Sequence, residues 1–292
     1  MHVGNLYASS KKPVVSFEFF PPRNEKAAAT FDKVVDTLAK TEPDYMAVTF
    51  GAGGSNREGS YQTVTKLLAE KKCPTVAYIA GFGLGPEEIS RELDRYEKLG
   101  VETIFVIRGD EPQDADFVPS KESFEHASSM VAYIRDRYPF CLGCAGYPEG
   151  HVQAESIEKD IQYLKLKQDN GASYVVAQYC YDNDIFFNYV AKCREAGVSI
   201  PIIPGIMPVY TLTLTKTLSK VCGTTITDEL QKGLDQLVDA DKDAVLDFGV
   251  DVAVEQCRGL LKNDVPGLHF YTMDRSKSTT EIVTRLRREK LL

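Results

Sequence analysis

The first residue that could do acid–base chemistry is Glu18, which stands inside the apolar segment 13–22. Residues 14–20 are mostly β-branched or aromatic and two prolines follow, a pattern typical of a buried strand that ends there. A lone carboxyl group among apolar side chains is costly to ionise, so Glu18 could donate a proton near neutral pH. The alternative is a strand-end glutamate paired with an arginine or a lysine.

Similar strand-like segments recur along the whole chain. They lie at 14–20, 45–51, 74–80, 103–109, 141–147, 174–180, 201–207 and 268–273. The first seven begin about 30 residues apart, and segments with helical periodicity separate them. These helical segments lie at 25–40, 61–71, 86–99, 121–137, 155–169, 183–196 and 211–221, with a last one at 280–290.

Eight strand–helix units at this spacing predict an α/β fold, a parallel (β/α)8 TIM barrel. The long interval before the last strand predicts extra helices near 228–238 and 244–261. No Gly/Ser-rich linker divides the chain, so residues 1–292 are expected to form a single domain. A doubly wound sheet is the alternative, but no G-x-G-x-x-G motif follows the first strand.

The active site of such a barrel collects at the carboxyl ends of its strands, and polar residues and glycines are concentrated there. They include Thr49 with glycines 51, 53 and 54, Arg108-Gly109-Asp110, Tyr147 with His151, Gln178, and Tyr271 with Arg275. Each signal is weak alone: the glycines also fit a tight turn, and His151 also fits a capping role. Residues 81–85 (GFGLG) lack the lysine and the spacing of a phosphate loop.

Composition excludes several classes of protein. The formal charge of −8 argues against a nucleic-acid or anionic-membrane partner. No apolar run approaches the ~18 residues of a membrane helix, and residues 1–12 lack the apolar core of a signal peptide. A cytoplasmic location is therefore expected.

The seven cysteines are an odd number scattered through apolar segments, which indicates reduced, buried thiols. Cys141 and Cys144 have a C-x-x-C spacing, but positions three apart on a strand point to opposite faces. No second C-x-x-C accompanies them, so no metal site is expected.

Together the motifs are far more specific, and the chain resembles the methylenetetrahydrofolate reductase family in its bacterial form, which has the catalytic domain only. The motifs that carry the resemblance are SFEFFPP at 16–22, VTFGAGG at 48–54, RGDEP at 108–112, AGYPEGH at 145–151, PIIPGIMP at 201–208 and FYTMDR at 270–275. They cover nearly the whole chain in the order of the family's barrel.

The resemblance implies an FAD-dependent oxidoreductase of one-carbon metabolism and methionine biosynthesis. Hydride would pass from NADH or NADPH to FAD and then, by a ping-pong mechanism, to 5,10-methylenetetrahydrofolate, giving 5-methyltetrahydrofolate. A homo-oligomer is implied as well. Two alternatives stay open: the same barrel as a subunit that takes electrons from an iron–sulfur partner protein, and a folate- or flavin-binding barrel without activity.

The resemblance also implies roles for individual residues. Glu18 would be the acid that helps to open the imidazolidine ring of the folate, and Asp110 the carboxylate beside the flavin and the pterin. The positions implied to bind FAD are Thr49, Gly51, Ala52, Arg108, Gly109, Asp110, Tyr147, His151, Asp160 and Lys167. Those implied to bind the folate are Glu18, Gln178, Tyr271 and Arg275.

Some positions depart from the family's pattern. Many members carry His-x-Thr on the third strand near the flavin, and the matching positions are expected at Thr75 and Ala77. Tyr163 and Leu166 stand where relatives have Asn and Arg facing FAD, and Leu218 stands where an aromatic ring stacks on the substrate. Each lost hydrogen bond would cost about 1 kcal/mol of binding.

Overall fold

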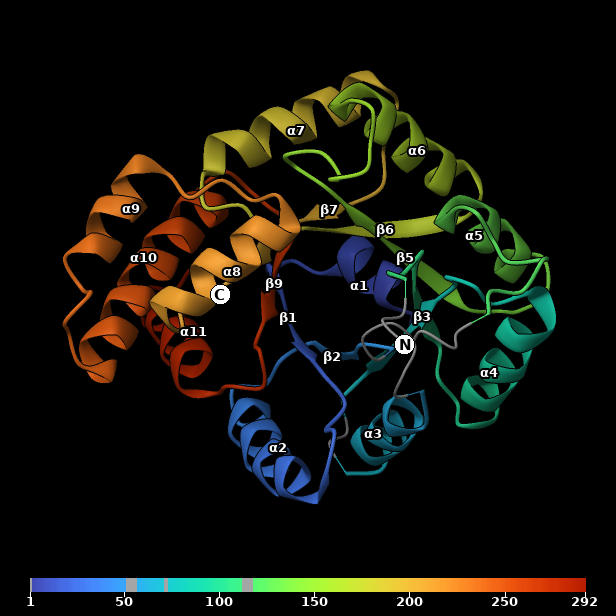
Figure 1. Cartoon of the computed structure of the whole chain (residues 1–292), viewed down its shortest axis with the longest axis horizontal. Coiled ribbons are helices and arrows are strands. Elements are labelled where there is room, and N and C mark those ends of the chain that lie inside the picture. The colour runs from blue at the N-terminus through green and yellow to red at the C-terminus, as the bar shows by residue number, and fades with distance from the viewer. Residues whose placement is uncertain (1, 51–56, 71–72, 112–117) are drawn as a thin grey trace.

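Parallel strands form a nearly closed barrel in the computed structural model, which describes residues 2–50, 57–70, 73–111 and 118–292 (Figure 1). The hydrogen-bonded order is β7-β6-β5-β4-β3-β2-β1-β9-β8. The strands are β1 (Val14–Phe19), β2 (Tyr45–Val48), β3 (Thr75–Ala80), β4 (Thr103–Ile107), β5 (Cys141–Gly146), β6 (Ala172–Ala177), β7 (Ile202–Ile203), β8 (Gly205–Ile206) and β9 (Gly267–Tyr271). The predicted (β/α)8 barrel is confirmed.

The seventh strand position of the barrel is occupied by two short strands, β7 and β8. Pro204 separates β7 from β8 because proline has no N–H to donate to a ladder. β7 pairs with β6, whereas β8 pairs with β9, so this one segment joins the two ends of the sheet. The carbonyl of Pro204 accepts a hydrogen bond from the His269 N–H at 3.1 Å.

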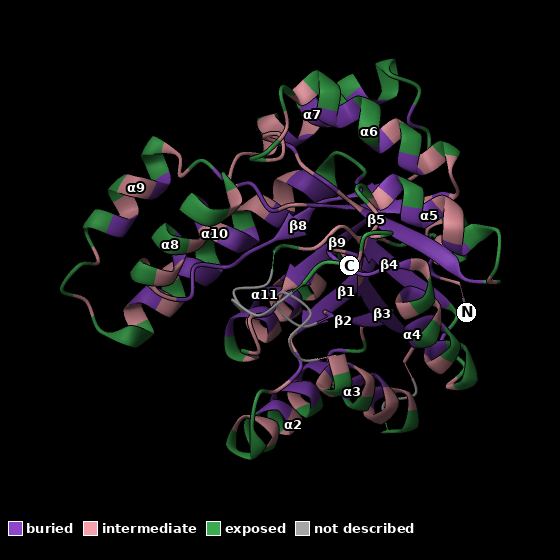
Figure 2. Cartoon of the chain, turned by 45° about the vertical axis from the view of Figure 1, so that its right-hand side comes forward, coloured by how far each residue is buried: buried purple, intermediate pink, exposed green. Residues whose placement is uncertain are grey.

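All but the first of the described helices lie around the barrel, and their exposed faces point away from it (Figures 1 and 2). The helices are α1 (Val3–Ser9), α2 (Glu25–Ala39), α3 (Arg57–Glu70), α4 (Pro86–Lys98), α5 (Ala127–Arg135), α6 (Ile157–Asp169), α7 (Asn183–Glu195), α8 (Leu212–Cys222), α9 (Asp228–Asp235), α10 (Lys242–Lys262) and α11 (Lys277–Arg288). The first, α1, lies in the middle of the ring, where Tyr7 contacts Tyr45 and Tyr174. The extra helices predicted before the last strand are α9 and α10. Among the described residues, no helix combines the length and apolar character needed to cross a membrane.

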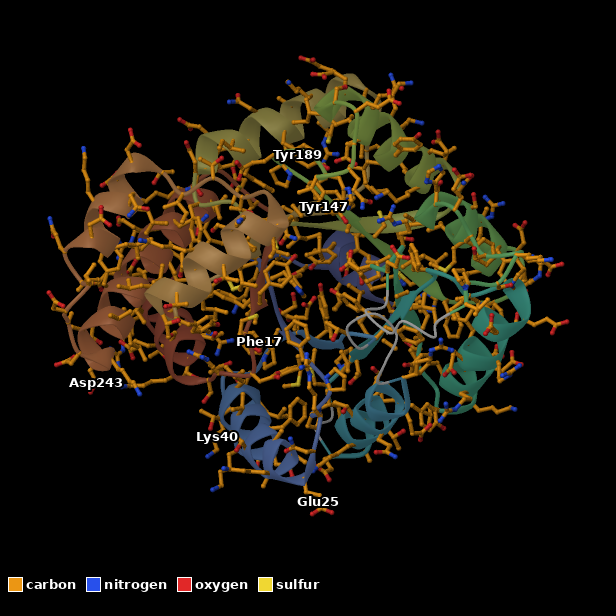
Figure 3. The ribbon with its side chains drawn as sticks, in the orientation of Figure 1. Phe17, Glu25, Lys40, Tyr147, Tyr189 and Asp243 are labelled. Carbon is orange, nitrogen blue, oxygen red and sulfur yellow. The ribbon has the colours of Figure 1, made fainter. Side chains whose placement is uncertain are left out.

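Side chains on β1 alternate between the barrel interior and the surrounding helices. Phe17 and Phe19 point outward, and the ring of Phe19 lies 5.7 Å from that of Phe31 on α2. Ser16 and Glu18 point inward, as the alternation predicts. Side chains such as Phe17 lie toward the middle of the molecule, whereas Glu25 and Asp243 lie at its edge (Figure 3).

Candidate active site

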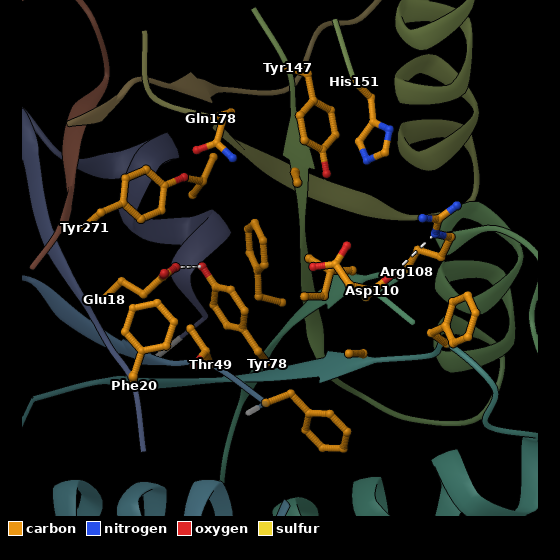
Figure 4. A pocket seen from close by; sticks show the side chains of 18 of the residues that line it. Glu18, Phe20, Thr49, Tyr78, Arg108, Asp110, Tyr147, His151, Gln178 and Tyr271 are labelled. Atoms are coloured by element: carbon orange, nitrogen blue, oxygen red, sulfur yellow. Dashed lines mark hydrogen bonds between the residues drawn. The ribbon is translucent and has the colours of Figure 1, made fainter. Parts of the chain in front are cut away.

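A cavity of about 370 Å³ opens at the carboxyl ends of the strands (Figure 4). Glu18, Gln178 and Tyr271 line one end of it, and Arg108 and Tyr147 line the other. The fold therefore brings these polar residues, which come from different strands, to one place.

Glu18 lies at one end of this cavity, here called the acid end after its carboxyl group, and is 6% exposed. Its Oε2 accepts a hydrogen bond from the Tyr78 hydroxyl at 2.5 Å, and Nε2 of His269 lies 3.4 Å from the same oxygen. On its other side, Nδ1 of His269 is 2.8 Å from Oγ of Ser16. The carboxyl group is thus held by polar side chains on β3 and β9, and no lysine or arginine lies within ion-pair distance of it in the described part of the chain.

Gln178 and Tyr271 flank Glu18 in the cavity (Figure 4). Tyr271 pairs with Glu18 across β1 and β9, and its hydroxyl donates to the carbonyl of Ala177 at 3.2 Å. Burial, and then the charge of Glu18, raise the pKa of Tyr271, so this phenol stays protonated. Oε1 of Gln178 accepts from the Tyr179 N–H at 3.1 Å, which leaves its amide NH2 as the group that could contact a ligand.

The opposite end of the cavity carries Asp110, Arg108, Tyr147 and His151. The ring of Tyr147 meets that of His151 edge-on, with centroids 4.7 Å apart. Nδ1 of His151 accepts from the Gln153 N–H at 3.1 Å, and burial lowers the pKa of His151. The imidazole is therefore neutral near pH 7 with its proton on Nε2, which can donate a hydrogen bond to a ligand.

A second cavity of about 210 Å³ adjoins the first and shares Arg108, Tyr147 and His151 with it. Asp160 and Lys167, both on α6 and each 8% exposed, line this second cavity. Nζ of Lys167 donates to the carbonyl of Ala145 at 2.7 Å, while burial raises the pKa of Asp160 against the opposing charge of Lys167. A buried cation and a buried carboxyl group therefore face one space.

Two features of the cavity wall fit a flat, polar ligand. Oγ1 of Thr49 is buried and has no hydrogen-bond partner within the described ranges, so it is available to a ligand. Gly109 has a φ of +81°, and a Cβ there would lie 2.9 Å from Cβ of Ala80. Only glycine therefore fits where the chain turns past the cavity.

The structure does not place three of the expected binding residues at the described cavities. Gly51 and Ala52 fall outside the described residues. Arg275 is exposed and its guanidinium lies 5.4 Å from the ring centroid of Tyr210, and it does not line either cavity.

The positions of the expected departures also change. Thr75 and Ala77 do not line the described cavity; the residues of β3 that do are Tyr78 and Ala80, two apart and nearer the carboxyl end. The register that pairs Glu18 with Ala47, and Ala47 with Val76, turns Thr75 and Ala77 away from the barrel interior. A contact from these two positions to a flavin in the cavity is therefore not supported.

The remaining departures lie in three different settings. Tyr163 lines the second cavity, and Leu166 lies at the surface, 44% exposed. Leu218 packs against the cluster of Tyr179, Met207 and Tyr210.

Ser16, Tyr78 and His269 are the residues of the site that sequence reasoning missed. Ser16 and His269 are paired across β1 and β9, a neighbour relation that appears only once the barrel closes. A polar residue on the same strand face as Glu18 was a usable signal for Ser16.

Asp274 follows β9 and affects stability in a pH-dependent way. Its Oδ1 accepts a hydrogen bond from the Phe20 N–H at 3.1 Å. Burial raises the pKa of Asp274 to about 6; the Phe20 N–H opposes the rise and the charge of Glu18 adds to it. Because the folded pKa exceeds the unfolded value of about 4, the stability that the protonated group contributes is present below about pH 4. That contribution is lost as the pH rises through about 6.

We expect Asp274→Asn to be more stable than the parent chain above about pH 6, by up to about 2 kcal/mol of unfolding free energy. Asparagine keeps the acceptor for Phe20 and tolerates the positive φ of 52° at this position. The advantage should shrink towards pH 4 in urea unfolding measured across this range. Asp243→Asn is the control, since Asp243 is fully exposed beside Lys277 and should show no such gain. A stability difference that does not change with pH would contradict the prediction.

Comparison with known proteins shows which protein family the chain belongs to. The family model described as methylenetetrahydrofolate reductase matches residues 4–287. Methylenetetrahydrofolate reductase 1 of Schizosaccharomyces pombe is 36% identical over 280 residues, which are 94% of this chain and 46% of that protein. Methylenetetrahydrofolate reductase (NADH) 1 of Arabidopsis thaliana is 33% identical over 283 residues, 93% of this chain and 48% of that protein. The chain therefore spans about half the length of the curated relatives that it matches.

A solved structure shares the fold over 99% of this chain and 98% of its own, with a TM-score of 0.69 and 15% sequence identity. It is described as an uncharacterised protein from Clostridium thermocellum that binds two copies of 5-methyl-5,6,7,8-tetrahydrofolic acid. The fold and the cavity define a (β/α)8 barrel protein with a cavity at the carboxyl ends of the strands. Within that class, the chain belongs to the methylenetetrahydrofolate reductase family.

Proposed function

We propose that this chain is a flavin-dependent reductase that converts 5,10-methylenetetrahydrofolate into 5-methyltetrahydrofolate with NADH or NADPH as donor. Residues 1–292 would form its single catalytic barrel domain. The observation that carries the proposal is one cavity with a buried acid, Glu18, at one end and polar groups that continue into a second cavity at the other. The names of the relatives and the reduced folate bound by the fold neighbour support the same substrate class.

The residues around the two adjoining cavities fit FAD. The free Oγ1 of Thr49 and the Nε2–H of His151 could bind the polar edge of a flavin ring. Lys167 and Arg108 supply positive charge for phosphates, and Asp160 could accept from the hydroxyl groups of the ribityl chain. Bound there, FAD would accept a hydride from the nucleotide and deliver it to the folate.

The chain's own part in the reaction is acid catalysis and orientation. Glu18 would donate a proton to a nitrogen of the imidazolidine ring, which opens the ring to the reactive iminium. The amide NH2 of Gln178 would hold the folate beside this acid. Asp110, an exposed carboxylate at the mouth of the cavity, would favour positive charge on the substrate and lower the reduction potential of the flavin.

The visible spectrum of the purified chain tests this function. It should be yellow, should bleach anaerobically with NADH or NADPH, and should regain its colour when methylenetetrahydrofolate is added. A colourless chain that cannot be reconstituted with FAD would overturn the proposal. Bleaching by dithionite but by neither nucleotide would instead favour a protein electron donor, the alternative form of this function.

We expect Lys167→Met to weaken FAD binding about tenfold or more, because a charged hydrogen bond to a phosphate would be lost. The dissociation constant can be measured by titrating flavin-free protein with FAD and following flavin fluorescence. Lys165→Met is the matched control on the same helix, since Lys165 pairs with Asp169 and does not line either of the two adjoining cavities. Equal effects of the two substitutions would argue against phosphate binding by Lys167.

A further inference from the structure

Tyr78 contacts the proposed acid directly and has no role in the function described so far. Its hydroxyl donates to Oε2 of Glu18 at 2.5 Å, as the dashed line in Figure 4 shows. Tyr78 is on β3 and Glu18 on β1, with β2 between them. The residue of β2 that pairs with Glu18 is Ala47, whose short side chain leaves room for the phenol to reach across.

The direction of the Tyr78 side chain is fixed by packing. Its ring is stacked on that of Phe105, with centroids 4.4 Å apart and an interplanar angle of 23°. Burial and then the charge of Glu18 raise the pKa of Tyr78 well above its ordinary value, so the hydroxyl keeps its proton and stays a donor. The hydrogen bond therefore has one direction, from Tyr78 to Glu18.

We propose that Tyr78 is a positioning residue that holds Oε2 of Glu18 and favours the ionised carboxylate after the proton has been given to the substrate. Oε1 is then the oxygen that carries the proton into the cavity. The proposal rests on the proposed function, in which Glu18 is the acid. None of the residues that the resemblance assigns to FAD or to the folate is Tyr78, so this contact is read from the structure alone.

Other titratable groups also face Glu18, and their effects on its carboxyl group must be distinguished from the effect of Tyr78. These groups are His269 and Tyr271 on β9, Tyr45 on β2 and Asp274 after β9. Burial keeps the phenols of Tyr271 and Tyr45 protonated and therefore uncharged. Asp274 is a second carboxyl group near Glu18, and a negative charge on it would disfavour a negative charge on Glu18. Only Tyr78 and His269 lie within hydrogen-bond distance of the Glu18 carboxyl group in the described part of the chain.

Tyr78→Phe tests the proposal because it keeps the ring on Phe105 and removes only the hydroxyl group. Without its donor the ionised form of Glu18 is less stable, so the carboxyl group should retain its proton to higher pH. We expect the alkaline limb of folate-dependent flavin reoxidation to move upward by about one pH unit. The maximal rate should fall about tenfold because the acid is less well oriented. Reduction of the flavin by the nucleotide should not change.

The matched control is Tyr174→Phe. Tyr174 is buried inside the same barrel and its ring lies 6.0 Å from that of Phe105, but its hydroxyl has no partner among the described residues. This variant should keep the parent pH profile. In a Glu18→Gln background, Tyr78→Phe should have no further effect on the pH profile.

A second measurement does not depend on turnover. The infrared difference between the parent chain and Glu18→Gln isolates the carboxyl band of Glu18, and its midpoint against pH should shift upward in Tyr78→Phe. An unchanged midpoint, or a rate that falls equally at every pH, would overturn the role of Tyr78. A parent chain that does not reduce the folate would overturn the proposed function, while the infrared midpoint would still decide whether Tyr78 controls Glu18.

Discussion

Glu18→Gln is expected to lower the rate of methylenetetrahydrofolate reduction by about 10²–10⁴-fold, the usual contribution of a general acid. The side chain keeps its shape, and its amide oxygen can still accept from the Tyr78 hydroxyl, so the cavity should be preserved. What is lost is the proton that would be given to the ring nitrogen. FAD binding and reduction of the flavin by the nucleotide should stay within a few-fold of the parent chain, because Glu18 lies at the far end of the cavity from Tyr147 and His151.

Stopped-flow spectroscopy separates the two half-reactions by following bleaching and recovery of the flavin colour. The matched control is Glu92→Gln, which removes a buried carboxylate on α4 that pairs with Arg95 outside the cavity. It should leave both half-reactions unchanged. If Glu18→Gln slows flavin reduction as much as flavin reoxidation, its role would be structural and the assignment of the acid would be wrong.

The fold could be predicted well because strand and helix patterns alternate along the chain. Strand starts agree within two residues, since β-branched and aromatic runs begin where ladders begin. Strand ends are less accurate: the segment expected at 45–51 ends its ladder at Val48. The next two residues, Thr49 and Phe50, line the cavity, and their composition does not separate a ladder from a loop. The sequence pattern predicts no helix at Val3–Ser9, because seven residues give too short a periodic signal.

The part of the site that could be predicted is the set of residues at the ends of individual strands. Glu18 and Gln178 stand at strand ends, so the barrel alone brings them to one cavity. The partners of Glu18 could not be read from the chain, since Tyr78 and His269 reach it from other strands and their registers depend on closure of the barrel. Which residues of β3 face inward could not be read from the chain either. The register that pairs Ala47 with Val76 turns Tyr78 and Ala80 inward and Thr75 and Ala77 outward.

Closure of the barrel depends on Gly205, the first residue of β8. A Cβ at this position would lie 2.3 Å from the carbonyl oxygen of Ala177 and 2.5 Å from the ring of Tyr271. One of these contacts is backbone, which cannot rotate away. The other is the ring that lines the cavity beside Glu18. The absence of a side chain at Gly205 therefore lets β8 lie close to β6 and β9 where the two ends of the sheet meet. This meeting point is called the seam below.

Gly205→Ala is expected to destabilise the chain by about 3 kcal/mol, the upper part of the range for overpacking a core. For a domain of this size the melting temperature should fall by roughly 5–10 °C. Folate reduction should fall as well, because the displaced ring of Tyr271 would narrow the acid end of the cavity. Thermal and urea unfolding monitored by circular dichroism give the stability, and the flavin assay gives the activity.

Gly259→Ala on α10 is the matched control for this substitution. Its Cβ would meet only the side chain of Asn183, with Nδ2 at 2.6 Å. That side chain can move at the cost of its hydrogen bond to the carbonyl of Gln256, about 1 kcal/mol. Alanine also favours a helix over glycine by about 1 kcal/mol, so the stability should stay within about that amount of the parent chain. If Gly205→Ala were as stable as Gly259→Ala, the seam could not be as tightly packed as the contacts of Gly205 require. In that case closure between β6 and β9 would rest on other residues.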